Sequence, residues 1–149
     1  MGRKYFMKYS LELVKEDECC YNGKVISSVD AYKKVLEVFK LNKKAEEHLV
    51  MFCLDIKCNI IGAFLISKGG INYLYTNMAD IIKRALLCNS KRILIAHNHP
   101  SGSIEPSKED IKITKRIEDV CKLIDIELVD HLIIGYNNYK SLKSYSNIE

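Results

Sequence analysis

The feature that most constrains this chain is a short apolar run that ends in two alternate histidines. Residues 92–96 have the composition of a buried strand, and His97 and His99 follow directly. Because alternate residues of a strand project from the same face, the two imidazoles should lie side by side at its end. Residues 100–102 (Pro-Ser-Gly) then break the strand pattern, so we expect a loop there.

A helix is predicted directly after this loop. Ser107 is a residue type favoured at a helix N-cap, and apolar side chains recur on one helical face over residues 108–124. Asp110 then falls in the first turn of this helix. One carboxylate and two imidazoles supply three ligands for a divalent metal and leave a position open, as in catalytic zinc sites. The same Ser-x-x-Asp spacing is that of a capping box, so a purely structural interpretation also stays open.

The spacing of these residues resembles the motif of a known metalloprotease family. His97 and His99, seven further residues, Ser107, two more residues and Asp110 follow the His-x-His-x7-Ser-x-x-Asp pattern of the JAMM (MPN+) metalloproteases. The residues around these histidines, and the run Asp-His-Leu-Ile-Ile-Gly at residues 130–135, are similar to the bacterial RadC branch of that family.

This resemblance covers residues 28–145 and implies an α/β fold. The expected architecture is one three-layer domain with a mixed central sheet flanked by helices, the JAB/MPN arrangement that is related to cytidine deaminases. Residues 1–27 form an N-terminal extension in which residues 9–14 are a candidate edge strand, and residues 146–149 form a polar tail. Longer relatives carry a helix-hairpin-helix module ahead of this domain. Too few residues precede it here, so we expect the short single-domain form.

Hydrophobic periodicity predicts the elements of this domain. The Gly69-Gly70 pair should break the chain after the second strand, and residues 136–138 should turn into the polar tail. Leu86 is one of the apolar positions of the middle helix. The expected helices span residues 29–41, 77–88 and 108–124, and the expected strands span residues 46–55, 60–67, 92–96 and 126–135.

The resemblance also implies the chemistry, which is that of a zinc-dependent hydrolase acting on a peptide or isopeptide bond. His97, His99 and Asp110 would hold one zinc ion per chain. Glu47 would act as general base toward a zinc-activated water. The Ser107 hydroxyl would donate a hydrogen bond to the developing oxyanion, and it can accept a helix-capping hydrogen bond at the same time.

Glu47 is chosen over its neighbour by its position in the family pattern. In the RadC branch a glutamate begins the first long strand, eight residues before an aspartate, and Asp55 stands eight residues after Glu47. Glu46 would point to the opposite face of the strand, so only one of the two can face the metal, and Glu46 stays the alternative base. His48 faces away by the same alternation and is interpreted as structural.

Other positions either depart from the RadC branch or lack a derived role. Relatives often have Gly-Thr in place of Gly69-Gly70 and Pro-Arg in place of Met78-Ala79. Losing that arginine removes a contact for an anionic group, which affects the orientation of substrate rather than the binding of metal. Asp130 and His131 match the branch. They are either a structural pair at a strand end or the source of an outer contact to a zinc histidine.

Composition limits the class of protein. A chain of 149 residues with 48% hydrophobic and 28% charged residues has the values of one soluble globular domain. The net charge of +4 permits contact with nucleic acid without arguing for it. A protein or peptide substrate is the expected partner. The alternative from another class is a DNA-associated repair or recombination accessory protein, whose metal site would be structural or vestigial.

The six cysteines do not suggest a metal site, because none of them form a Cys-x-x-Cys pair. Cys53, Cys88 and Cys121 lie in apolar patterns, where free cysteine behaves as a small hydrophobic residue. The sequence has no signal-peptide pattern and no apolar run of membrane-spanning length. We therefore expect reduced cysteines, no membrane contact and a cytoplasmic location.

Overall fold

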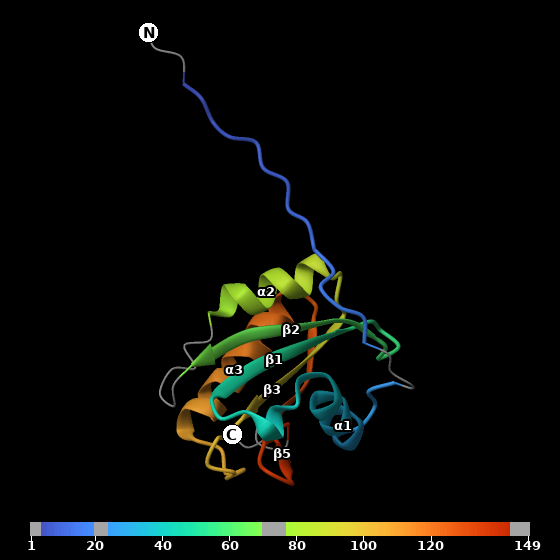
Figure 1. Ribbon diagram of the computed structural model, residues 1–149. Coiled ribbons are helices and arrows are strands. Elements are labelled where there is room, and N and C mark those ends of the chain that lie inside the picture. The colour runs from blue at the N-terminus through green and yellow to red at the C-terminus, as the bar shows by residue number, and fades with distance from the viewer. Residues whose placement is uncertain (1–3, 20–23, 70–76, 144–149) are drawn as a thin grey trace.

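A computed structural model describes residues 4–19, 24–69 and 77–143 of the chain. Of these, residues 28–69 and 77–141 form a five-stranded sheet with helices on both faces (Figure 1). In chain order the elements are α1 (Ser28–Phe39), the 3-10 helix η1 (Leu41–Lys43), β1 (Glu47–Leu54), β2 (Ile60–Gly69), α2 (Met78–Leu87), β3 (Arg92–Asn98), α3 (Lys108–Leu123), β4 (Glu127–Ile134) and β5 (Tyr139–Ser141).

The sheet is mixed and has the strand order β2-β1-β3-β4-β5. Strands β3 and β4 pair in parallel, whereas the β1–β2, β1–β3 and β4–β5 pairs are antiparallel. Parallel neighbours need a crossover, which α3 provides between β3 and β4. The predicted three-layer α/β architecture with a mixed sheet is therefore confirmed.

Two apolar layers enclose the sheet, one on each face. Ala31 and Val35 of α1 pack against one face. Ile81 of α2 and Ile117 of α3 pack against the other. Because helices cover both faces, a central strand is buried on both sides and reads as a continuous apolar run. The run from Leu49 to Leu54 in β1 is an example, since all its residues are buried.

Several boundaries differ from the predicted ones. Strand β5 was not predicted, because its three residues carry no apolar alternation and it is held by its ladder with β4. Gly69 belongs to β2 rather than to a break, and Gly70 lies outside the described residues. Leu86 is 55% exposed, because it stands five residues after the buried Ile81 and thus about 140° around the helix. The first helix ends at Phe39, before Lys40, which takes a left-handed backbone conformation with φ of 52°.

The described part of the N-terminal extension does not join the sheet. Residues 4–19 contain no helix or strand and run away from the domain, so the candidate edge strand at residues 9–14 is absent (Figure 1). The predicted polar tail at 146–149 lies outside the described residues. Within the described part of the chain the cysteines are free, and no helix combines the length and apolar character needed to cross a membrane.

Candidate metal centre

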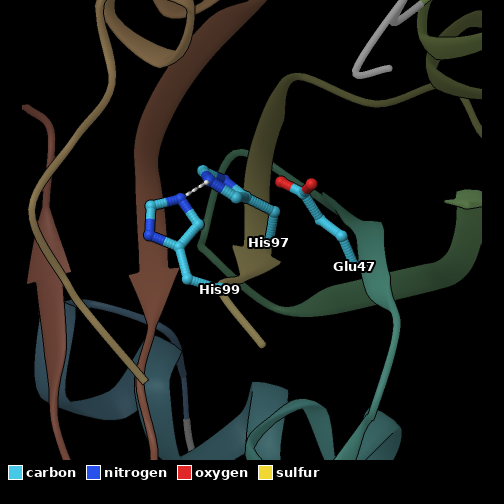
Figure 2. Close-up of side chains that lie close together, drawn as sticks. All are labelled: Glu47, His97 and His99. Atoms are coloured by element: carbon cyan, nitrogen blue, oxygen red, sulfur yellow. Dashed lines mark hydrogen bonds between the residues drawn. The ribbon is translucent and has the colours of Figure 1, made fainter. Parts of the chain in front are cut away.

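Three side chains from two neighbouring strands converge at one end of the sheet (Figure 2). Strands β1 and β3 run antiparallel with Leu49 paired to His97, so the start of β1 lies beside the end of β3. Glu47 begins β1, and His97 and His99 lie at and just after the end of β3. One donor atom from each of these three residues lies within 4.8 Å of the other two, so the group could hold a metal ion.

Asp110 joins this group from the first turn of α3. Its two carboxylate oxygens lie 3.2 Å from Nε2 of His97 and 3.4 Å from Nε2 of His99. The two Nε2 atoms are themselves 3.1 Å apart. The structure thus brings together all three residues that the sequence proposes as ligands, along with the residue that it proposes as base.

The beginning of α3 has the geometry of a capping box. The Ser107 hydroxyl accepts a hydrogen bond from the Asp110 backbone N–H at 3.0 Å, and the Asp110 carboxylate accepts one from the Ser107 N–H at 2.7 Å. The structural interpretation of the Ser-x-x-Asp motif is therefore confirmed. It does not exclude the chemical one, because the same carboxylate also contacts both imidazoles.

Burial and close contacts shift the acid–base properties of this group. Burial acts to raise the pKa of Asp110, but hydrogen bonds from His97 and His99 outweigh it and lower that pKa. The pKa of His99 is raised, chiefly by its hydrogen bond with Asp110. Burial raises the pKa of Glu47 above its ordinary value, although the charge of the imidazoles opposes the shift. A carboxylate with a raised pKa is a stronger base.

Each histidine is also fixed through its other ring nitrogen. Nδ1 of His99 lies 2.9 Å from the backbone carbonyl of Ser103. A carbonyl can only accept, so Nδ1 carries a proton, and Nε2 of the neutral ring is left with the lone pair that can bind a metal. Nδ1 of His97 lies 2.8 Å from Nε2 of His131. The predicted outer contact from the Asp130–His131 pair to a site histidine is thus present, and it comes from His131.

Asp130, the other member of that pair, has a different environment. Asp130 accepts hydrogen bonds from the His131 backbone N–H at 2.7 Å and from the Ser141 hydroxyl at 2.7 and 2.8 Å. It therefore ties β5 to β4 close to the histidine that contacts the centre. Burial raises the pKa of Asp130.

Two residues of the centre's surroundings were missed in the sequence. The Thr114 hydroxyl contacts both the backbone of Asp110 and the ring of His131. A threonine four residues after Asp110, inside a helix, was the available signal.

The second residue is Asn98. Its side chain accepts a hydrogen bond from the His48 N–H at 2.8 Å and donates one to the Glu46 carbonyl at 3.0 Å. This clamp holds the start of β1 against the end of β3.

The two adjacent glutamates at the start of β1 lie in different environments. Glu46 is exposed and precedes β1, whereas Glu47 is only 9% exposed and lies in the converging group. The His48 ring turns to the Glu46 carbonyl at 2.9 Å, away from the centre. The structure therefore places Glu47 rather than Glu46 beside the histidines.

A residue that follows β4 holds the loop between β3 and α3 in place. The Tyr136 hydroxyl donates to the Pro100 carbonyl at 2.9 Å. Gly102 has a φ of +82°, and a side chain there would collide with the ring of Tyr136. Only glycine combines this backbone conformation with such a close ring.

Comparison with known proteins agrees with this geometry. The profile of the RadC-like JAB domain family matches residues 26–147. A UPF0758 protein of Enterococcus faecalis is 40% identical over 121 residues, which cover 81% of this chain and 51% of the relative. A UPF0758 protein of Clostridium novyi is 40% identical over 135 residues, covering 89% of this chain and 58% of the relative.

A third relative, a UPF0758 protein of Streptococcus suis, is 30% identical over 135 residues, covering 91% of this chain and 54% of the relative. The chain thus spans about half the length of these curated relatives. The match of the family profile covers nearly the whole described domain, including both histidines, Glu47 and Asp110. This chain therefore belongs to the RadC-like JAB domain family.

Proposed function

We propose that the domain is a zinc-dependent hydrolase that cleaves a peptide or isopeptide bond in a protein or peptide substrate. The observation that carries this proposal is the convergence of His97, His99 and Asp110 on one point, with Glu47 beside them. Membership of a domain family that resembles the JAMM metalloproteases supports the reaction class.

The donor set fits a tetrahedral metal. Zinc binds histidine nitrogen and carboxylate oxygen at about 2.0 Å, so neighbouring ligand atoms of a regular tetrahedron are about 3.3 Å apart. The separations among the nitrogens of His97 and His99 and the oxygens of Asp110 are 3.1, 3.2 and 3.4 Å. Protons on the imidazole nitrogens join these atoms by hydrogen bonds in the absence of metal, and a divalent ion would take the place of those protons.

These residues have separate jobs in the proposed reaction. His97, His99 and Asp110 hold the ion. When bound, zinc acts as a Lewis acid and makes water acidic enough to supply a nucleophile near neutral pH. Glu47 accepts the proton and then passes it to the leaving amine. Ser107, at the start of α3, donates a hydrogen bond to the negative charge that develops on the carbonyl oxygen.

Glu47 could instead be a ligand, since its carboxylate lies within the same 4.8 Å group. Two observations favour the proton-transfer role. Asp110 already contacts both imidazoles, and a hydrogen bond from the Ser107 N–H orients it. The pKa of Glu47 is raised by burial, as a general base requires.

The Glu47→Gln variant tests this division of roles. Glutamine keeps the size and a polar end but cannot accept the proton, so zinc content should be unchanged while turnover falls by ~10²–10⁴-fold. The loss should appear in kcat more than in KM. Glu46→Gln is the matched control, because its side chain is exposed and should leave turnover unaltered.

A suitable assay compares protein N-termini generated in a cell extract by zinc-loaded wild-type protein and by Glu47→Gln. New termini should appear with wild type, disappear when a chelator is added and be absent with the variant. Identical termini from both proteins would contradict the proposed hydrolase. Loss of zinc from Glu47→Gln would instead make Glu47 a ligand.

A further inference from the structure

A chain of buried polar groups runs behind the candidate centre and links two of its proposed ligands. The Thr114 hydroxyl lies 2.6 Å from the backbone carbonyl of Asp110 and 2.7 Å from Nδ1 of His131. Nε2 of His131 lies 2.8 Å from Nδ1 of His97. None of the four residues is more than 6% exposed, so water does not compete for these hydrogen bonds.

The direction of the first hydrogen bonds follows from donor counting. A backbone carbonyl can only accept, and a threonine hydroxyl has a single proton. Thr114 therefore gives its proton to the Asp110 carbonyl, a contact from residue i to residue i−4 within α3. Its oxygen must then accept the second hydrogen bond, so Nδ1 of His131 carries a proton.

The remaining hydrogen bond joins two imidazole nitrogens, so one of them donates and the other accepts. The ring is 1% exposed, and its hydrogen-bond partners among the described residues are a hydroxyl and an imidazole rather than a carboxylate. A buried cation without a charged partner is strongly disfavoured, so the neutral ring is the stable form. With its proton on Nδ1, Nε2 of His131 is an acceptor, and Nδ1 of His97 must donate to it.

We propose that Thr114 and His131 are positioning residues that hold His97 in the Nδ1-protonated tautomer and so present its Nε2 lone pair to the metal. This inference rests on the metal site of the proposed function. His99 reaches the same tautomer through one backbone carbonyl, that of Ser103. His97 reaches it through two side chains, and these tie its tautomer to the backbone of Asp110.

Thr114→Val is the sharpest variant, because valine keeps the shape of threonine but neither donates nor accepts. Without the hydroxyl, Nδ1 of His131 has no acceptor, and the ring is free to carry its proton on Nε2 instead. Outer partners of metal ligands typically contribute 10–100-fold to metal affinity, so zinc should bind ~10–100-fold more weakly. Thr114→Ser keeps the hydroxyl and should restore an affinity close to that of wild type. A merely space-filling role of Thr114 would favour valine over serine.

The tautomers can be read directly by NMR of the full chain with nitrogen-15-labelled histidine, both free of zinc and zinc-loaded. In the wild-type protein, Nδ1 of His97 and Nδ1 of His131 should both carry protons in both states, and Nε2 of His131 should not. His48→Gln is the matched histidine control, since its ring contacts the Glu46 carbonyl and lies outside this chain of contacts. It should change neither the spectra of His97 and His131 nor the zinc affinity.

Two results would overturn the inference. One is a wild-type His131 that carries its proton on Nε2. The other is a Thr114→Val protein with unaltered tautomers and unaltered zinc affinity. Failure of the proposed function would look different, because the wild-type protein would then bind no zinc at all, while the zinc-free spectra would still decide the tautomers.

Discussion

The chain begins two of its helices with the same four-residue motif. Ser27 and Asp30 open α1, and Ser107 and Asp110 open α3. Both pairs form a capping box. The serine hydroxyl accepts from the aspartate N–H at 3.1 Å in α1 and 3.0 Å in α3. The aspartate accepts from the serine N–H at 3.1 Å in α1 and 2.7 Å in α3.

What differs is the surroundings of each motif. The Asp30 carboxylate lies at the surface and also accepts from the Ser27 hydroxyl at 2.8 Å. Asp110 is 2% exposed and faces the imidazoles of His97 and His99. The comparison shows that a local motif specifies the helix start, whereas the strand ends that lie opposite specify its chemistry.

The two serines differ in the same way. The Ser27 hydroxyl already donates its proton to Asp30. Among the described contacts of Ser107, the hydroxyl accepts from the Asp110 N–H. A hydroxyl in that position can still donate, which suits the proposed role of Ser107 toward a developing oxyanion.

The largest predicted effect separates the two aspartates. Asparagine keeps an oxygen that accepts the capping hydrogen bond but loses the charge. Asp110→Asn should therefore weaken zinc binding by more than ~100-fold, because outer partners alone contribute 10–100-fold. Asp30→Asn should bind zinc as wild type does. Titration against a chromophoric chelator measures both, and equal affinities of the two variants would erase the distinction between the motifs.

A smaller effect separates the two serines. Ser27→Ala and Ser107→Ala should each lower the free energy of unfolding by about 1 kcal/mol through the lost cap. Ser107→Ala should in addition reduce turnover by ~10²–10³-fold while zinc content stays constant. Urea denaturation and kinetics on a verified substrate supply the two measurements. Equal turnover of both variants would remove Ser107 from the reaction.

The smallest effect concerns the pH dependence of the surface motif. The hydrogen bond from the Ser27 hydroxyl is the largest cause that lowers the pKa of Asp30 below its ordinary value of 3.8. A lowered pKa in the folded state means that the charged form stabilises the fold above pH 3.8, and that this contribution is lost as the pH falls through the folded-state pKa.

Denaturation of wild type and Asp30→Asn across this range tests the point. The wild-type advantage in the free energy of unfolding should hold near neutral pH and shrink below pH 3.8. An advantage that grows on acidification would have the wrong sign for this motif.

The sequence predicted those parts of the fold that carry strong periodicity. Strands β1 and β3 and helix α3 have long apolar patterns and clear start signals. They carry Glu47, His97 and Asp110, and His99 directly follows β3. Strand β5 could not be foreseen, because three residues are too few to show alternation and its ladder with β4 depends on the tertiary fold. The exposure of Leu86 likewise depends on how wide a stripe the sheet covers.

The candidate site shows the same limit. Motif spacing identified the residues that point into the centre, because strand alternation and helix capping are local rules. It left the contact of His131 open and missed Thr114 and Asn98. Thr114 also contacts Asp110 four residues away, but His131 lies 17 residues from Thr114 and 34 from His97, and His48 lies 50 from Asn98. The β3–β4 and β1–β3 pairings and the packing of α3 against β4 bring these residues together.

The central claim is that His97, His99 and Asp110 hold a metal ion, and that Glu47 accepts a proton without being a ligand. Elemental analysis of the purified full chain tests this claim most directly. Wild type and Glu47→Gln should each contain one zinc per chain. The double variant His97→Ala, His99→Ala should contain almost none. Near-full zinc occupancy in the double variant would contradict the account.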